Sequence, residues 1–137
     1  MRNITSIIFE GIPEKYLGLQ FVVQGTGLGF VPYINHRLDD HYLELGYVIP
    51  ALEELPSDYI DDQFHWGTQP IDQPGNDSTY LATMIDMIGS DNAMFASGLP
   101  HGVTDLPKTM LDRLGPFFRS EEFRAIMGGN ATELYGL

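Results

Sequence analysis

The sequence predicts an α/β protein built on a short parallel β-sheet. Three short apolar runs are typical of buried strands, at residues 19–23, 64–68 and 93–97. Each run is followed by a segment in which apolar residues recur every three or four positions, as they do on one face of a helix. Because parallel strands need long crossover connections, usually helices, this alternation favours a parallel sheet covered by helices. No linker interrupts the chain, so residues 1–137 are expected to form a single domain.

The N-terminal half is predicted to contain one strand and three helices. Isoleucines at helical spacing predict a first helix over the opening dozen residues. The strand at 19–23 ends in the glycine-rich turn 25–27, and a second helix is expected over residues 29–46. A short third helix should follow, with Ser57 as its N-cap.

The C-terminal half is predicted to contain the other two strands, separated by a polar loop and one helix. Ser78 is expected to cap that helix, which continues to residue 88. After the third strand, two helices are expected near 108–114 and 120–127, with a last turn over 131–135.

The composition excludes several classes of partner. With 19 acidic and 7 basic residues, the net charge is −12, which repels phosphate backbones and anionic lipids. Nucleic acid and membrane surfaces are therefore poor partners, and a solubilising acidic surface is the simplest explanation of the charge. The chain has no cysteine, so disulfides and thiolate metal sites are excluded. No run approaches the ~20 apolar residues of a membrane span, and we expect a cytoplasmic protein.

Five segments of the sequence, in order, resemble the later part of a metal-dependent amidohydrolase. The segments are Phe9–Tyr16, Phe21–Asp39, Phe64–Pro70, Met94–His101 and Gly128–Gly136. The similar branch is the one related to the aminocarboxymuconate-semialdehyde and resorcylate decarboxylases. The resemblance implies the C-terminal portion of a (β/α)8 TIM barrel, with about three parallel strands and outer helices, beginning after the fifth strand.

The same resemblance implies that this chain alone holds no metal. The family's metal-binding histidines on strands one and five would lie outside the sequence. Within it, Gly25 and Gly98 occupy positions where the family carries ligand-type residues, and glycine has no side chain to bind with. A divalent metal (zinc, manganese or iron) is therefore expected on a partner chain.

Three polar residues follow strands on the face where barrel enzymes keep their active sites. Gln24 and Gln69 end the first two strands and are candidates for binding a substrate carboxylate or carbonyl. His101, in the loop after the third strand, is the candidate catalytic residue and a further candidate for substrate binding. The alternative in each case is a residue that braces a loop through bonds to the backbone.

Arg37 is the fourth candidate for substrate binding. In the resemblance, Arg37 matches an arginine of the family's long helix that contacts the substrate or a subunit interface. In so acidic a chain, pairing with Asp39 or Asp40 is the alternative. The flanking His36 and His41 are five residues apart, which does not place both rings toward one metal on a helix.

Three strands with outer helices leave an apolar inner face uncovered. Loss of burial of about eight large apolar side chains would cost roughly 12–24 kcal/mol, against a domain stability of about 5–15 kcal/mol. We therefore expect a larger amidohydrolase-like partner that supplies strands one to five, or else self-association into a symmetric dimer. The predicted function is the small subunit of a split enzyme that hydrolyses or non-oxidatively decarboxylates a small organic substrate, inactive alone. The alternatives are a non-catalytic scaffold or regulatory subunit, and an independent binding domain or truncated gene product.

Overall fold

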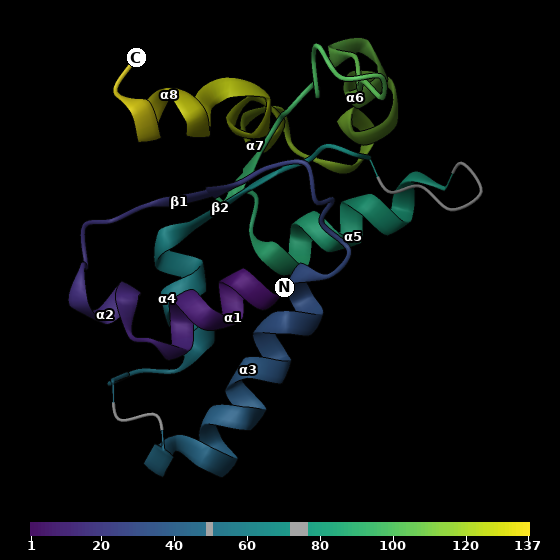
Figure 1. The fold of residues 1–137 in the computed structure, drawn as a ribbon. Coiled ribbons are helices and arrows are strands. Elements are labelled where there is room, and N and C mark those ends of the chain that lie inside the picture. The colour runs from purple at the N-terminus through teal and green to yellow at the C-terminus, as the bar shows by residue number, and fades with distance from the viewer. Residues whose placement is uncertain (49–50, 72–76) are drawn as a thin grey trace. The chain divides into compact units, whose positions relative to one another are not determined.

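The structure of the protein is a computed structural model that describes residues 1–48, 51–71 and 77–137 (Figure 1). The chain divides into two compact units. Unit 1 comprises Met1–Phe21 and Phe30–Phe64, and unit 2 comprises Val22–Gly29 and His65–Leu137. Within the described ranges, no helix is both long and apolar enough to cross a membrane.

Unit 1 consists of helices around an isoleucine- and leucine-rich core. Its elements are α1 (Arg2–Phe9), α2 (Ile12–Lys15), α3 (Val31–Leu45), a 3-10 turn (Gly46–Val48) and α4 (Pro56–Gln63). The helices predicted over the first dozen residues and over 29–46 are thus confirmed, with somewhat shorter bounds. Ile8 and Val31 are fully buried, because apolar residues at helical spacing on α1 and α3 form one inward face each.

The start of α4 differs from the prediction. Pro56 occupies the first turn and Leu55 is the N-cap, so Ser57 is not the cap. The Asp58 carboxylate instead accepts a bond from the Leu55 N–H at 3.2 Å. The Ser57 backbone N–H donates to Asp39 Oδ1 at 2.9 Å, so the first turn of α4 is fixed by two aspartates rather than by a serine hydroxyl.

The sheet has three strands in the order β1 (Phe21–Val23), β2 (Phe64–Gly67) and β3 (Ala93–Met94). β2 and β3 pair in parallel, with Trp66 opposite Ala93 and Gly67 opposite Met94. The predicted parallel sheet is confirmed, although each strand is shorter than expected. β3 ends at Met94 because the next backbone N–H groups bond elsewhere: Phe95 N–H donates to Ile126 O at 2.8 Å.

In unit 2, α5 (Ser78–Ile88) packs against α6 (Pro107–Leu114) through buried apolar side chains. These side chains include Leu81, Ile85, Met110 and Leu114. The predicted span of α5 is confirmed, but its cap is Asp77, whose Oδ1 accepts from the Thr79 N–H at 2.9 Å. Asp77 accepts this bond best when ionised, and the bond lowers its pKa.

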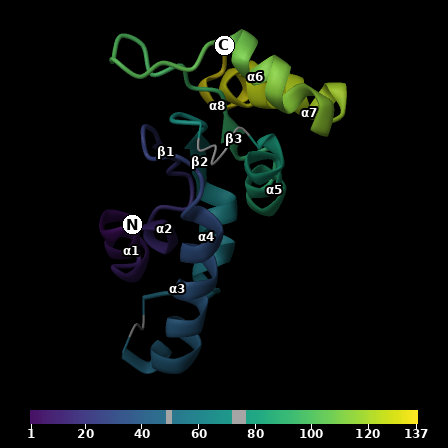
Figure 2. The same cartoon turned by 90° about the vertical axis from the view of Figure 1, so that its right-hand side faces the viewer.

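The C-terminal segment runs from a 3-10 turn (Gly115–Phe117) through α7 (Ser120–Arg124) and a wider π-helical turn (Ala125–Gly129) to α8 (Asn130–Tyr135). α7 and α8 both pack against this π-helical turn, and all of these elements belong to unit 2 (Figure 2). The Asn130 amide donates to Ser90 O at 2.7 Å and to Ala93 O at 2.8 Å. These bonds fasten the start of α8 to the turn before β3.

Candidate functional site

The loops that follow the three strands form the candidate site, which we call the loop cluster. It comprises residues 24–27, 68–71 and 95–105, all of which belong to unit 2. Because the strands are parallel, their carboxyl ends lie at one edge of the sheet. Gln24, Gln69 and His101 belong to this cluster as predicted, whereas Arg37 lies on α3 in unit 1.

Thr68 anchors the loop cluster to the sheet. Its side chain is completely buried. Its backbone N–H donates to Met94 O at 2.9 Å, and its hydroxyl Oγ1 accepts from the Ala96 N–H at 3.3 Å. Backbone pairing between β2 and β3 ends at Met94, and the Thr68 hydroxyl holds the next segment, residues 95–97, beside β2 through this hydrogen bond. The sequence reasoning missed Thr68, although a polar residue at the end of a buried strand was a usable signal.

Gln69 joins all three loops. Its carbonyl oxygen accepts from the Gly27 N–H at 3.3 Å, and its side-chain Nε2 donates to Val103 O at 3.2 Å. The other amide atom, Oε1, accepts no bond from a described residue. Gln69 therefore braces the loops through its nitrogen and keeps an acceptor oxygen for another molecule.

Gly98 has no room for a side chain. Its φ is +72°, a left-handed conformation that favours glycine. A Cβ built on Gly98 would lie 2.8 Å from Gln69 Cδ, 2.9 Å from Gln69 Nε2 and 2.8 Å from Val103 O. The space into which a residue at position 98 would extend is occupied by the Gln69 amide. A side chain at this position would therefore require both the Gln69 amide and the Val103 backbone to move.

The turn at Gly98 presents His101 to solvent. The His101 N–H donates to Gly98 O at 2.8 Å, which closes the turn through its backbone and leaves the exposed imidazole accessible. Asp105 braces the same loop: its N–H donates to Ser97 O at 2.9 Å, and its Oδ2 accepts from the Ile71 N–H at 3.0 Å. Asp105 is thus a structural residue of the cluster.

Gln24 is an exposed residue at the end of β1, and its Cγ lies against Gly67. A Cβ on Gly67 would approach Gln24 Cγ to 3.3 Å and Ala96 Cβ to 3.4 Å. The glycine in β2 therefore allows the segments after β1 and β3 to lie close on either side. Gly25 has φ +73° with open space around it, so the turn requires its backbone freedom and nothing else.

The described residues do not fit a metal ion. No group of three or more His, Cys, Asp or Glu side chains in the described ranges is arranged to hold one. His65, in β2 between two buried aromatic residues, is half-buried, and burial lowers its pKa.

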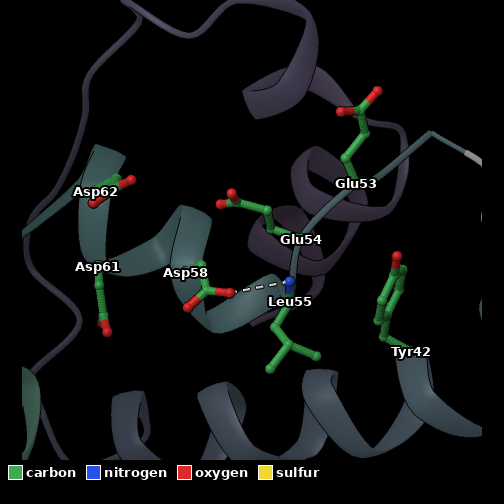
Figure 3. Close-up of a pocket in the computed structure, with 7 residues that line it drawn as sticks. All are labelled: Tyr42, Glu53, Glu54, Leu55, Asp58, Asp61 and Asp62. Carbon is green, nitrogen blue, oxygen red and sulfur yellow. Dashed lines mark hydrogen bonds between the residues drawn. The ribbon is translucent and has the colours of Figure 1, made fainter.

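An acidic surface in unit 1 forms an open hollow of ≈ 700 Å³ beside α4. Figure 3 shows its lining, in which the Asp58 carboxylate bonds to the Leu55 N–H, while Asp61 and Asp62 point in different directions. Partial desolvation raises the pKa of Asp61, and the neighbouring charges of Asp58, Asp62 and Asp39 raise it further. The carboxylates repel one another and do not converge on a common point, so this surface is not a metal centre.

Arg37 does not form the expected ion pair with Asp39 or Asp40. In the ranges that the structure describes, the ion pairs are Lys108–Asp112 and Arg119–Glu122. Asp39 is instead used by the backbone of Ser57, and Arg37 lies beside an apolar groove between α1 and α3.

Several solved structures resemble this chain. An amidohydrolase from Mycobacterium avium subsp. paratuberculosis K-10 is 24% identical with a TM-score of 0.79, and the match covers 96% of this chain and 32% of that one. 5-Carboxyvanillate decarboxylase from Sphingomonas paucimobilis is 20% identical with a TM-score of 0.66, and the match covers 99% of this chain and 39% of that one. A dihydroxybenzoic acid decarboxylase from Polaromonas sp. JS666 was solved with manganese and the inhibitor 2-nitroresorcinol. It is 21% identical with a TM-score of 0.72, and the match covers 98% of this chain and 39% of that one.

These structures establish the fold, and the chain spans between 32% and 39% of their length. No curated protein matches the sequence. The sequence model of the family described as Amidohydrolase, however, matches residues 1–137, from one end to the other. The resemblance inferred from the five segments is confirmed, and the chain belongs to the amidohydrolase family.

Proposed function

We propose that this chain closes the barrel of an amidohydrolase-type enzyme whose first five strands and metal ligands belong to a larger partner chain. The assembled enzyme would act on a small organic acid by non-oxidative decarboxylation or by hydrolysis. In this proposal residues 1–137 act as one partial-barrel domain. The observation that carries the proposal is the filled position at Gly98, where Gln69 and Val103 leave no space for a ligand side chain.

Uncovered apolar surface supports a missing set of strands. Parallel strands of a barrel are normally buried on both faces, but all three residues of β1 remain partly exposed. β1 and β3 are also the two edges of the sheet in the described chain. In the loop after β3, Leu99 and Val103 are 67% and 65% exposed. Additional strands and their loops would cover both regions.

The polar groups left open in the loop cluster suit recognition of an acid rather than metal chemistry. Gln69 Oε1 can accept a hydrogen bond from a hydroxyl or a protonated carboxyl group, and the exposed Gln24 amide can both donate and accept hydrogen bonds. The His101 imidazole can donate to a carboxylate or phenolate. We propose that these three side chains orient the substrate, with His101 nearest to the reacting group. The metal, manganese in the Polaromonas relative, would be held by the partner.

A non-catalytic scaffold is the second candidate, and the bracing of the loop cluster favours it. Gln69 Nε2 and the Asp105 carboxylate are both engaged in bonds to the backbone of neighbouring loops. If all the polar groups serve such bonds in the assembly, the chain would stabilise an active partner without touching the substrate.

Co-expression separates these functions. The chain would be produced alone and together with an amidohydrolase-like polypeptide that ends near its fifth strand, and each product would be analysed by native mass spectrometry and elemental analysis. Carbon dioxide release from dihydroxybenzoate and carboxyvanillate would report decarboxylation. The proposal expects a heteromeric, metal-containing complex that is active, and a larger chain that is inactive alone.

Variants of the complex identify the contribution of this chain. Replacing His101 by Gln should lower kcat/KM, while Lys108→Gln, which removes only an exposed helix ion pair, should not. A larger chain that is fully active and metal-loaded alone would assign the scaffold role. A monodisperse monomer of this chain that unfolds cooperatively by itself would contradict the need for a partner.

A further inference from the structure

Two hydrogen bonds tie the loop after β2 to the loop after β3 within unit 2. The Gln69 side-chain Nε2 donates to Val103 O at 3.2 Å, and the Ile71 backbone N–H donates to Asp105 Oδ2 at 3.0 Å. The first bond is exposed to solvent, whereas the second is partly buried. The bond to the Asp105 carboxylate is also the charge-assisted one, so it should be the stronger of the two.

Asp105 also closes the loop to which it belongs. Its backbone N–H donates to Ser97 O at 2.9 Å, so residues 97–105 form a closed loop with His101 near the middle. The backbone of Asp105 therefore holds the base of this loop, while its side chain holds the loop after β2. A single residue thus fixes where the His101 loop stands relative to the segment that carries Gln69.

The His101 loop depends on these hydrogen bonds because it has little apolar packing of its own. Leu99 and Val103 are 67% and 65% exposed. A Cβ added at Gly102 would meet nothing within 4 Å. A segment with few buried apolar contacts opens locally at small cost, and its hydrogen bonds then decide where it lies.

We infer that Asp105 is a positioning residue of the substrate site, which fixes His101 and Gln69 relative to each other without touching the substrate. The inference rests on the substrate-binding role proposed for these two side chains. A displacement of about 1 Å at a reacting group can lower a rate on the order of 100-fold. Loss of the Asp105 carboxylate should therefore lower kcat more than it raises KM.

Amide hydrogen exchange tests the contact itself, on the chain in the assembly in which it purifies. Asp105→Ala should speed exchange of the Ile71 N–H at least about tenfold, because the acceptor is gone. Asp105→Asn keeps an acceptor oxygen and should stay within about threefold of the unchanged chain. Asp112→Ala, which removes an exposed carboxylate of α6, is the matched control and should change nothing at Ile71.

Asp105→Ser, whose side chain is too short to reach the Ile71 N–H, replaces the alanine variant if that one does not fold. Unchanged exchange at Ile71 in the variant that lacks the carboxylate would overturn the inference, whether or not the assembly is active.

Steady-state kinetics of the co-expressed assembly, with dihydroxybenzoate and carboxyvanillate as substrates, tests the positioning role. Asp105→Ala should lower kcat at least about tenfold and change KM less than about threefold, and Asp105→Asn should restore most of the loss. In a His101→Gln background, Asp105→Ala should have a clearly smaller effect, because the side chain that it positions is already missing.

Two kinetic results would overturn the inference. An equal loss in Asp105→Asn and Asp105→Ala would make the carboxylate a reacting group, and an equal factor in both backgrounds would make its role purely structural. An assembly that is inactive on both substrates with the unchanged chain refutes the proposed function instead. Failure of the inference alone appears as an active assembly that Asp105→Ala leaves unchanged.

Discussion

Replacement of Gly98 by alanine is the sharpest test of how the loop cluster is built. The substitution adds one carbon to a residue with φ +72°, where an L side chain is strained. That carbon would lie 2.8 Å from Gln69 Cδ and 2.8 Å from Val103 O, both closer than Cβ atoms normally come to other atoms. The variant therefore combines a backbone cost with an overpacking cost.

The two costs can be estimated and then separated by controls in the same region. A left-handed non-glycine residue costs about 1–2 kcal/mol, and overpacking costs about 1–3 kcal/mol, so Gly98→Ala should lose about 2–5 kcal/mol of unfolding free energy. Gly25 has φ +73° with nothing within 4 Å of its added Cβ, so Gly25→Ala should lose only the backbone part. Gly102→Ala, in the same loop as Gly98 and also with open space, should change stability by less than about 0.5 kcal/mol.

The assay is urea unfolding of the three variants and of the Gly98→Ala/Gln69→Ala double variant. Removing the Gln69 amide relieves the contacts at 2.8 and 2.9 Å but not the contact with Val103 O, so the double variant should recover about 0.5–2 kcal/mol relative to additivity. Gly98→Asp should not make this chain bind metal, because the space beside position 98 is occupied by Gln69 and Val103. Elemental analysis of the variant would test this. If Gly98→Ala lowers the unfolding free energy by no more than Gly25→Ala does, the inference that Gln69 and Val103 fill the space beside Gly98 is wrong.

Three further predictions follow from named contacts. Tyr59→Phe should lower the unfolding free energy by about 1–3 kcal/mol, measured by thermal unfolding. The Tyr59 hydroxyl accepts hydrogen bonds from the Glu53 and Glu54 N–H groups at 3.1 Å each and donates one to Glu14. Tyr47 is 82% exposed, so Tyr47→Phe is the control and should not change the stability measurably. Asn130→Ala should lose about 1–2 kcal/mol and speed amide exchange in the turn before β3, whereas unchanged exchange would mean that the two bonds from Asn130 do not hold that turn. Desolvation and neighbouring carboxylates raise the pKa of Asp61, so the folded chain holds that proton more tightly and its stability falls as pH rises above 3.8, the ordinary value. Asp61→Asn should therefore stabilise the protein at pH 7 by up to about 0.5 kcal/mol, with no gain below about pH 3.8.

The elements with a long, regular apolar pattern were predictable from the sequence. The isoleucine spacing of α1, the long apolar face of α3 and the span of α5 each match the structure within a few residues. Helix starts were less predictable, because Ser57 and Ser78 look like caps but lie one or two positions inside helices that Leu55 and Asp77 begin. A cap depends on which side chain reaches the free N–H groups, and neighbouring candidates differ too little in sequence to decide this.

The sequence alone determined the family, the parallel sheet, and the absence of side-chain ligands at positions 25 and 98, because these depend on residue type and order along the chain. Only the tertiary structure decided that Gln69 fills the space beside Gly98, that Thr68 and Asp105 tie the loops together, and that Arg37 lies unpaired at an apolar groove. These contacts join residues 28 to 34 positions apart, or rows of side chains on two helices. Local pattern carries no information about such distances, which are set when helices and strands pack together.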